Sequence, residues 1–273
     1  MHRFSLLFAL TYALVIPMAC GSSAKATGTK DEEGLEVVRK AEKPTVTADT
    51  AGANPTPAEI KEFQAIWELY RKKDPKWPLA RNRFTAKSAG AAQLMAVTFL
   101  KYYMEVNAER SERGKELVGI KNEIVSIGAP CAPFLADIMV LDQIKRQDGK
   151  YFRTDDITRY DCIDMLGRMG GQAVPSLMRV LERPDLGVKG RRLTALALGG
   201  TRDPAVFDTL SKMLLEDESW QVRADAASGL GKLGDRRGLQ PLGQAIMHDK
   251  DPAVQKRAQK ARREIYAAAG RPR

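Results

Sequence analysis

Few residues of this 273-residue chain could carry out chemistry. The chain has three cysteines and two histidines, and His248 is the one histidine beyond the apolar N-terminal segment. A histidine metal site needs further ligands at suitable spacing, and a Ser-His-Asp triad needs a nucleophile motif such as Gly-x-Ser-x-Gly, which is absent. The Gly-Lys-Ser/Thr of a phosphate-binding loop is absent too. We therefore expect no catalytic residue, no metal and no cofactor, and we interpret His248 as a polar residue at a helix C-terminus.

Cys20 has a different chemistry, which depends on the apolar run in front of it. Residues 4–18 are mostly apolar and follow a short positive start, and this run is shorter than the ~20 residues of a spanning helix, as is typical of an export signal. The stretch Ile-Pro-Met-Ala-Cys-Gly at 16–21 resembles a bacterial lipobox, in which signal peptidase II cuts before the cysteine and the thiol receives diacylglycerol. Ala19 is the small residue expected before the cut, whereas Pro17 replaces the usual leucine-like residue. The resemblance implies lipidation of Cys20.

The alternative is ordinary signal peptidase cleavage at a small-x-small site, such as 22–24 or 24–26. The lipobox hypothesis makes residues 1–19 the signal peptide and places the mature protein in the periplasm or on the outer membrane as a lipoprotein, and export is expected on either cleavage model. Residues 20–55 are rich in Ala, Thr, Gly, Lys and Glu without apolar periodicity, which predicts a flexible tether.

The chain is basic, with a formal net charge of +10 and a pI near 9.5. This balance favours acidic partners, such as anionic lipid head groups, acidic envelope polymers or acidic proteins. Export makes nucleic acid the less expected partner. Cys131 and Cys162 match no ligand motif, so the sequence leaves two possibilities: two buried small side chains or one disulfide.

Residues 56–114 form an N-terminal helical region. Thr56, Pro57 and Glu59 predict an N-cap, a first helical residue and a capping box. Helical apolar spacing covers residues 60–70, a break is expected at 72–82, and a second helix is expected over 86–110. Because no segment alternates like a strand, we expect an all-helical chain. The aromatic residues of this region are interpreted as helix packing and not as a binding box: Trp77, Tyr102 and Tyr103.

A 32-residue repeat dominates the rest of the chain, from residue 115 to 273. The pairs Leu166-Gly167, Leu198-Gly199 and Leu230-Gly231 recur at that interval. An earlier copy is displaced by an insertion at 142–152. Repeats of this length predict a helical solenoid in which each helix pair buries its apolar face on its neighbours. Asp203 and Asp251 are expected to cap helices, and Gly170, Gly200 and Gly234 to relax helix ends.

A polar series follows the same interval. Aspartates stand at 185, 217 and 249, and arginines stand at 159, 191 and 223, with Gln255 in the next arginine position. Together with the Leu-Gly-x-Leu-Gly-Asp stretch at 230–235, this pattern resembles the HEAT-repeat family, in its short bacterial variety also found in phycobilin lyases. The resemblance is specific over 166–258. It implies an all-α, right-handed solenoid of about four helix pairs, and a structural ladder between repeats made of Asp185, Arg191, Asp217, Arg223 and Asp249.

The closing helix, from residue 251 onward, is strongly basic. Arg262 stands where earlier repeats have Leu198 and Leu230, which is typical of a capping helix with a polar outer face. The alternative is a contact surface for anionic membrane or polymer, made of Lys256, Arg257, Lys260, Arg262 and Arg263.

These observations favour a membrane-tethered, non-enzymatic scaffold that binds a protein partner in the bacterial cell envelope. Fold alone does not assign function, so two alternatives stay open: a lyase-like enzyme or accessory factor, and a basic binder of anionic envelope polymers. Bilin attachment is cytoplasmic, so the export signal argues against the lyase. It also argues against the DNA glycosylases that share such repeats.

Overall fold

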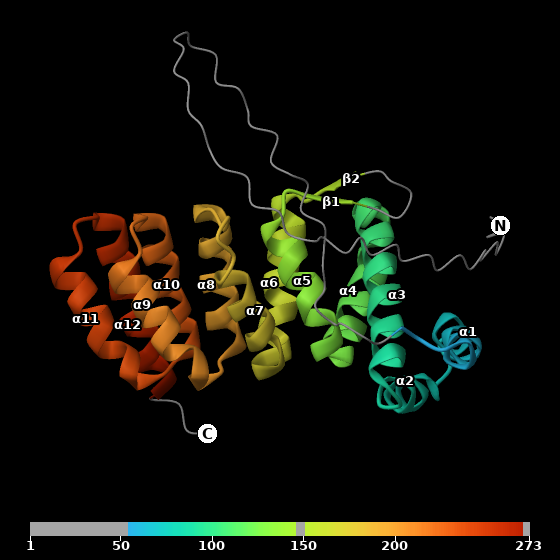
Figure 1. Cartoon of the computed structure of the whole chain (residues 1–273). Helices are drawn as coiled ribbons and strands as arrows, with labels where there is room; N and C mark the ends of the chain where they lie inside the picture. The colour runs from blue at the N-terminus through green and yellow to red at the C-terminus, as the bar shows by residue number, and fades with distance from the viewer. Residues whose placement is uncertain (1–53, 146–150, 270–273) are drawn as a thin grey trace, which may run out of the picture. The chain divides into compact units, whose positions relative to one another are not determined.

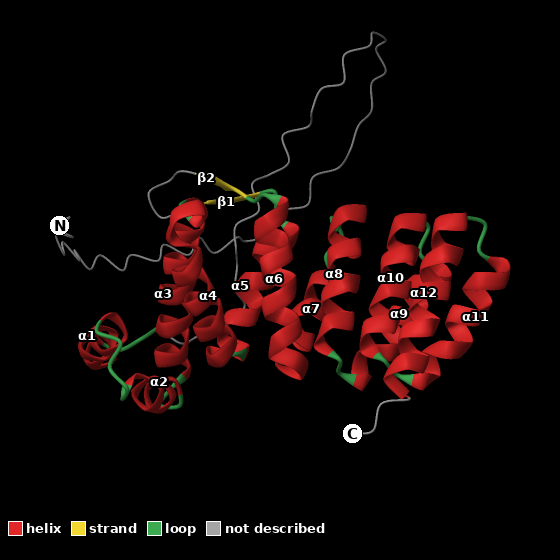
Figure 2. Ribbon diagram, turned by 180° about the vertical axis from the view of Figure 1, so that it is seen from behind, coloured by secondary structure: helices red, strands yellow, loops and turns green. Residues whose placement is uncertain are grey.

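The structure is a computed structural model that describes residues 54–145 and 151–269. All of these residues fall within one compact unit, which is built almost wholly of helices (Figures 1 and 2). The predicted signal peptide 1–19, Cys20 and nearly all of the predicted tether 20–55 lie outside the described residues.

Three helices precede the repeats: α1 (Pro57–Arg71), α2 (Trp77–Thr85) and α3 (Ala89–Ala108). The predicted capping box is present, since the Glu59 backbone N–H donates to Thr56 Oγ1 at 3.2 Å and the Thr56 N–H donates to Glu59 Oε2 at 2.6 Å. The predicted break at 72–82 is wrong in part, because α2 occupies its second half. Proline is tolerated in the first turn of a helix, where the backbone N–H has no intrahelical acceptor, and Pro78 lies in that turn.

The aromatic residues of this region form a packed cluster. Trp77 lies 5.6 Å from Phe99 and 5.0 Å from Tyr70, measured between ring centroids. Trp77 and Phe99 are buried, and Tyr103 is fully buried nearby. Tyr102, half buried, also stands edge-on to Trp67 at 5.8 Å. These contacts make the cluster part of the core that joins α1, α2 and α3.

Four helix pairs and a closing helix make up the rest, as the sequence predicted. The helices of each pair are separated by a short 3-10 turn. The pairs are α4 (Arg110–Ile127) with α5 (Ala132–Val140), α6 (Asp156–Met169) with α7 (Val174–Leu181), α8 (Val188–Thr201) with α9 (Phe207–Glu216), and α10 (Trp220–Leu233) with α11 (Leu239–His248), followed by α12 (Pro252–Ala269).

The pairs stack into two layers (Figure 1). The first helix of each pair packs on the first helix of the next, so that α4, α6, α8, α10 and α12 form what we call the first-helix layer. The second helices α5, α7, α9 and α11 form the other layer. The fold is therefore an all-α solenoid.

Glycines bring the helices of the first-helix layer into backbone contact. A Cβ atom on Gly199 would lie 2.3 Å from Gly229 Cα, and one on Gly231 would lie 2.9 Å from Ala261 Cα. The leucines beside them, Leu198 and Leu230, are fully buried. The Leu-Gly repeat thus supplies, at each step of the stack, one buried core side chain and one contact between the backbones of neighbouring helices.

Helix ends follow the sequence prediction at most positions. Asp203 Oδ1 accepts from the Ala205 N–H at 2.9 Å, and Asp251 Oδ1 accepts from the Ala253 N–H at 2.8 Å. Gly170 and Gly234 have positive φ angles of 62° and 73°. Gly200 does not end a helix: it lies inside α8 against Gly167, and Arg202 takes the left-handed conformation instead.

The two strands of the described chain lie at the insertion that was predicted at 142–152. Strands β1 (Gln143–Lys145) and β2 (Tyr151–Arg153) pair antiparallel, with Ile144 opposite Phe152. The prediction that no segment forms a strand is wrong here, because three residues are too few to show an alternating pattern. The buried Arg159 side chain joins the two ends of this hairpin by donating to the backbone carbonyls of Leu141 and Thr154.

Cys131 and Cys162 are free thiols without contact with solvent. Burial raises the pKa of both thiols well above the usual range. Among the described residues no single helix is long and apolar enough to span a membrane. The bent pair α4 and α5 passes on length and composition together, with a 108° angle between its helices. Its apolar residues Ile124 and Leu135 are fully buried in the solenoid.

Candidate functional site

The predicted arginines at 191 and 223 each bind an aspartate with two parallel hydrogen bonds. Arg191 on α8 donates from Nε to Asp217 Oδ2 at 2.8 Å and from Nη2 to Oδ1 at 3.1 Å. Arg223 on α10 donates likewise to Asp249, at 2.7 and 3.0 Å. Asp217 and Asp249 each lie at the end of the second helix of that pair, just before the next first helix begins. Each arginine therefore ties its helix to the entry of the following repeat.

These pairs are linked into one chain of hydrogen bonds. Arg223 Nη1 donates to the Asp217 carbonyl at 3.0 Å, and Gln255 Nε2 donates to the Asp249 carbonyl at 2.8 Å. Gln255 thus keeps the backbone contact of the arginine position without the ion pair. Since α12 is the closing helix, no further aspartate follows for it to bind in the described residues.

Both partners of the last rung are held in their charged forms. The hydrogen bond to Asp249 raises the pKa of the Arg223 guanidinium. At Asp249, partial burial acts to raise the pKa of the carboxyl, but the hydrogen bonds from Arg223 and the Asp251 backbone N–H outweigh it and lower the pKa. The Asp249 side chain is 7% exposed and accepts from Arg223 Nε, Arg223 Nη2 and the Asp251 N–H, which is the geometry of a structural contact.

Asp185 does not join the ladder, so that prediction is wrong. Its side chain is exposed, and no ion pair or hydrogen bond connects it to any described residue. Arg159 stands before Asp185 at the same interval as Arg191 stands before Asp217, but it donates to Asp142 Oδ1 at 2.6 Å and to the Leu141 carbonyl at 3.0 Å. The physical reason is the insertion, which brings the base of the β-hairpin to Arg159 and replaces the aspartate from the next repeat.

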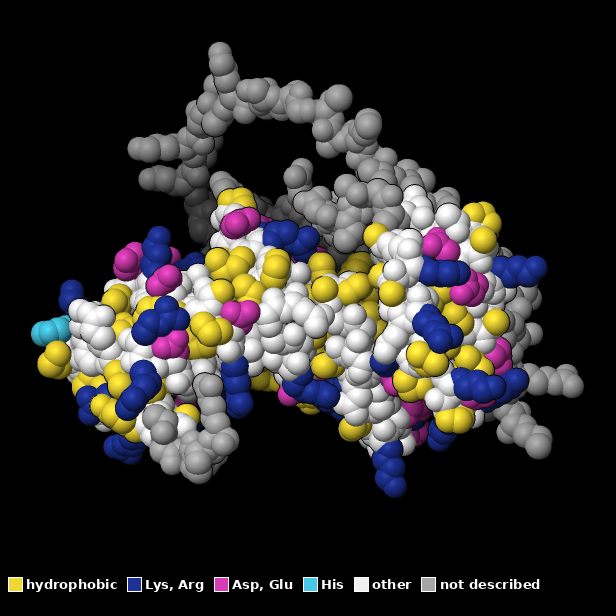
Figure 3. Space-filling model, turned by 90° about the horizontal axis from the view of Figure 1, so that it is seen from below, with side chains coloured by type: hydrophobic (Ala, Val, Ile, Leu, Met, Phe, Trp, Pro, Cys, Tyr) yellow, Lys and Arg dark blue, Asp and Glu magenta, His cyan; other side chains and the backbone are white. Residues whose placement is uncertain are grey.

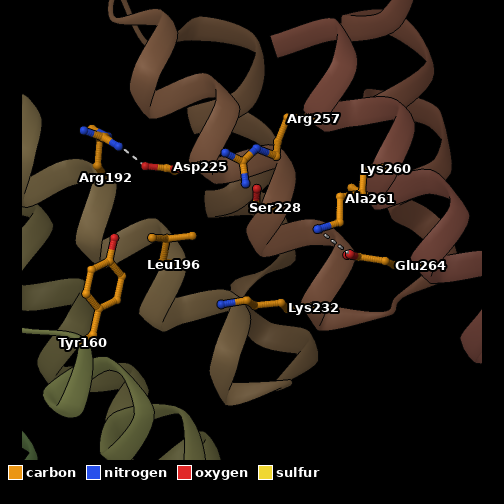
Figure 4. A pocket seen from close by; sticks show the side chains of 10 residues that line it. All are labelled: Tyr160, Arg192, Leu196, Asp225, Ser228, Lys232, Arg257, Lys260, Ala261 and Glu264. Atoms are coloured by element: carbon orange, nitrogen blue, oxygen red, sulfur yellow. Dashed lines mark hydrogen bonds and ion pairs between the residues drawn. The ribbon is translucent and has the colours of Figure 1, made fainter. Parts of the chain in front are cut away.

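The first-helix layer carries a groove on its exposed side (Figure 4). The groove has a volume of ≈ 320 Å³ and crosses four helices. It continues into a second hollow of ≈ 380 Å³ toward Val188 and Lys189. The side chains that line the first part are Tyr160 from α6; Arg192 and Leu196 from α8; Asp225, Ser228 and Lys232 from α10; and Arg257, Lys260, Ala261 and Glu264 from α12.

These lining residues occupy equivalent positions of successive repeats. Leu196, Ser228 and Lys260 are 32 residues apart, and Arg192 lies the same interval after Tyr160. Sequence reasoning missed this surface, because it searched the repeat for residues that recur. The surface could instead have been found from positions on the outer face of the first helices where the residue type changes from repeat to repeat.

The two acidic side chains of the groove each have a cationic partner, whereas two of its cationic side chains have no acidic partner among the described residues. Asp225 is only 6% exposed and accepts from Arg192 Nε at 2.8 Å, and Glu264 lies 3.8 Å from Lys260 Nζ. Lys232 and Arg257 have no ion-pair or hydrogen-bond partner among the described residues. Figure 4 shows both side chains extending into the groove, from α10 and from α12.

The structure divides the predicted basic contact surface on α12. Arg257 and Lys260 line the groove, whereas Lys256, Arg262 and Arg263 are exposed outside its lining. On the face seen from below, basic side chains are interspersed with acidic and apolar ones and form no single patch (Figure 3). His248 is exposed at the end of α11, as expected for a polar helix C-terminus.

In the part of the chain that the structure describes, no group of three or more His, Cys, Asp or Glu residues could hold a metal ion.

Stacked helix pairs with a common register define an α-solenoid, the class in which each repeat contacts only its neighbours. Residues 188–263, which run from α8 into α12, match the family of HEAT repeats. This segment is therefore similar to HEAT repeats, and repeats of this kind generally mediate protein interactions. No curated protein shows significant similarity to the chain.

Proposed function

We propose that this chain is a non-enzymatic scaffold that binds a protein partner in the bacterial cell envelope through the groove of the first-helix layer. The observation that carries the proposal is the groove itself, which crosses four helices and combines apolar side chains with two uncompensated cations. Solenoids use extended surfaces of this kind for binding.

The composition of the groove fits a protein interface better than a reaction site. Tyr160 is 58% exposed and lines the groove together with Leu196, Arg192 and Arg257. Aromatic and arginine side chains contribute most of the binding energy in protein interfaces. The two acids of the groove already bind cations, so neither is poised as a general base.

Membrane tethering and export form the second half of the proposal and rest on the sequence. The lipobox-like stretch that ends at Cys20 supports a lipid anchor in the envelope, with the segment up to about residue 55 as the tether. Two acyl chains would make such an anchor stable, since each buried methylene contributes ~0.8 kcal/mol.

Replacing the candidate lipidated residue tests the anchor. In the wild type we expect membrane fractionation and incorporation of labelled palmitate, and in Cys20→Ala we expect a soluble exported protein without label. A wild-type chain that carries no palmitate and fractionates like the variant would contradict the anchor. Retention of either protein in the cytoplasm would contradict export.

Crosslinking in intact cells tests the scaffold role. A photo-crosslinking amino acid at Leu196, inside the groove, is expected to capture a specific protein. The same amino acid at Met247, exposed on α11 in the other layer, serves as the matched control. Equal crosslinks from both positions, or none from Leu196, would contradict a partner in the groove.

Binding of anionic envelope polymers is the second candidate function, because Lys256, Arg262 and Arg263 are exposed on α12 outside the groove. Such binding would weaken as salt rises. Loss of salt-sensitive binding to polymer in a variant of these three residues, with groove crosslinks intact, would establish it as a separate activity.

A further inference from the structure

We propose that the groove of the first-helix layer takes a linear acidic peptide segment, with carboxylates on Lys232 and Arg257 and an apolar side chain on Tyr160 and Leu196. This inference rests on the proposed scaffold function and names the chemistry of the partner. It follows from how charge and apolar surface are distributed along the groove.

The end of the groove formed by α10 and α12 carries net positive charge, which is complementary to an acidic ligand. Asp225 and Glu264 are the two acids of the lining, and each has its own cation in Arg192 and Lys260. Removing these two pairs leaves Lys232 and Arg257 as net positive charge, on neighbouring helices that face the same hollow (Figure 4). Two carboxylates of one peptide could therefore bind them together.

The centre of the groove offers a backbone contact. Ser228 Oγ donates its hydrogen to the Ala224 carbonyl at 3.1 Å, so the oxygen keeps its acceptor capacity. It stands in the groove between Leu196 and Arg257 (Figure 4). A peptide N–H passing over α10 could donate to it.

The opposite end is the more apolar one. Tyr160 from α6 and Leu196 from α8 line it, and the groove continues toward Val188. The charged side chains Lys189 and Asp156 also line this continuation, and they pair with each other at 3.4 Å. The difference between the two ends fixes the orientation of the bound peptide. Its apolar side chain must lie toward α6, and its acidic side chains must lie toward α12. A charged polymer of repeating units has no side chain to bury here.

A membrane surface fits this site less well than a peptide does. The two uncompensated cations stand in a hollow, and the exposed cations Lys256, Arg262 and Arg263 are not part of its lining. A flat layer of anionic head groups would contact these exposed cations alike and would not select the two that line the hollow. A peptide chain is narrow enough to enter.

A peptide array tests the inference with the exported Cys20→Ala chain. The probes are octapeptides with two glutamates and one leucine at all positions in a serine background, with matched sets in which glutamine or lysine replaces glutamate. We expect binding to a subset of the glutamate peptides, at least about tenfold weaker binding to the glutamine set, and weakening by salt. Equal binding of the glutamate and glutamine sets, or no binding, would overturn it.

Charge reversal within the groove gives the second arm. The variant Lys232→Glu/Arg257→Glu is expected to lose the glutamate peptides and to gain the lysine set. Both side chains are exposed, so the fold should persist, which circular dichroism checks. The control Lys256→Glu/Arg263→Glu has the same net charge change outside the groove and should bind like the parent. Equal losses in both variants would overturn the inference.

The remaining outcomes separate this inference from the scaffold role. Vesicles with phosphatidylglycerol replace the peptides in a parallel assay, and vesicle binding that depends on Lys232 and Arg257 without any peptide binding would assign the groove to membrane and overturn the inference. Groove-specific crosslinks to a protein without acidic-peptide binding would also overturn it, while the scaffold proposal would stand. Absence of crosslinks would contradict the scaffold proposal itself.

Discussion

Arg223 on α10 and Asp249 before α12 form a two-point ion pair, with Nε–Oδ2 at 2.7 Å and Nη2–Oδ1 at 3.0 Å. The two side chains are 16% and 7% exposed. The same guanidinium also donates to the Asp217 carbonyl at 3.0 Å. One side chain thus connects α10 to the loops on both sides of its own helix pair, which explains why arginine recurs at this repeat position.

Truncation of this arginine should therefore destabilise the fold. Arg223→Ala leaves the Asp249 carboxylate without its cation in a largely buried place, and we expect a loss of about 2–4 kcal/mol in the free energy of unfolding. Urea denaturation measures it. The control Arg71→Ala removes an exposed ion pair with Glu68 at 2.8 Å and should cost about 1 kcal/mol or less. Unchanged stability together with lost partner binding would contradict the structural role.

The same ion pair predicts how stability depends on pH. The pKa of Asp249 in the folded protein lies below its usual value of 3.8, so the unfolded chain takes up this proton first. The stabilisation is then complete above about pH 4 and is lost as pH falls through the lowered pKa. We expect the stability difference between the wild type and Asp249→Asn to shrink on going from pH 6 to pH 3 in urea denaturation. A difference that grows with acid would contradict the lowered pKa.

Thiol reactivity tests the state of the two buried cysteines. Burial and a raised pKa protect the thiolates of Cys131 and Cys162. In the Cys20→Ala chain we expect no reaction with a disulfide reagent at pH 8 in the native state and two thiols per chain in denaturant. Absence of thiols in denaturant would reveal the disulfide that the sequence left open.

The sequence predicted those parts of the fold that every repeat must supply for itself. Each stacking step needs a buried leucine, a glycine that allows two helix backbones to touch, and an aspartate that binds the arginine of the preceding repeat. Residues of these types therefore recur, as at Leu198, Gly199 and Asp217. Arg159 could not be assigned in this way, because an insertion unique to one repeat supplies its partner. The groove depends on helix register and on positions such as Tyr160 and Ser228, where the repeats differ. Variation between repeats marks such positions, but it does not say which of them line one groove.

Close packing between α8 and α10 makes one glycine hard to replace. A Cβ atom on Gly199 would meet the Gly229 backbone at 2.3 Å, so Gly199→Ala must push two helices apart, and we expect a loss of about 1–3 kcal/mol. At Gly243 on α11 a Cβ atom would have no neighbour within 4 Å, and Gly243→Ala should instead stabilise by about 0.5–1 kcal/mol. Thermal and urea denaturation of both variants check the contrast. Similar effects at the two positions would contradict backbone contact.

The end of the solenoid depends on two arginines that replace the Leu-Gly pair. Arg262 and Arg263 stand 32 residues after Leu230 and Gly231, and both are exposed on α12. A long charged side chain at the glycine position keeps another helix away, and an arginine at the leucine position leaves no apolar contact for it. We therefore expect these two arginines to end the apolar stack at α12.

Replacing the two arginines by the leucine and glycine of the repeat should allow another helix to pack on α12. In Arg262→Leu/Arg263→Gly we expect α12 to pack on a second copy of the chain, so that the variant dimerises or assembles further in analytical ultracentrifugation while the wild type does not gain this contact. Arg262→Leu alone is the matched control, because Arg263 still holds the backbones apart, and it should associate far less. A double variant that sediments like the wild type would mean that the two arginines are not what ends the stack.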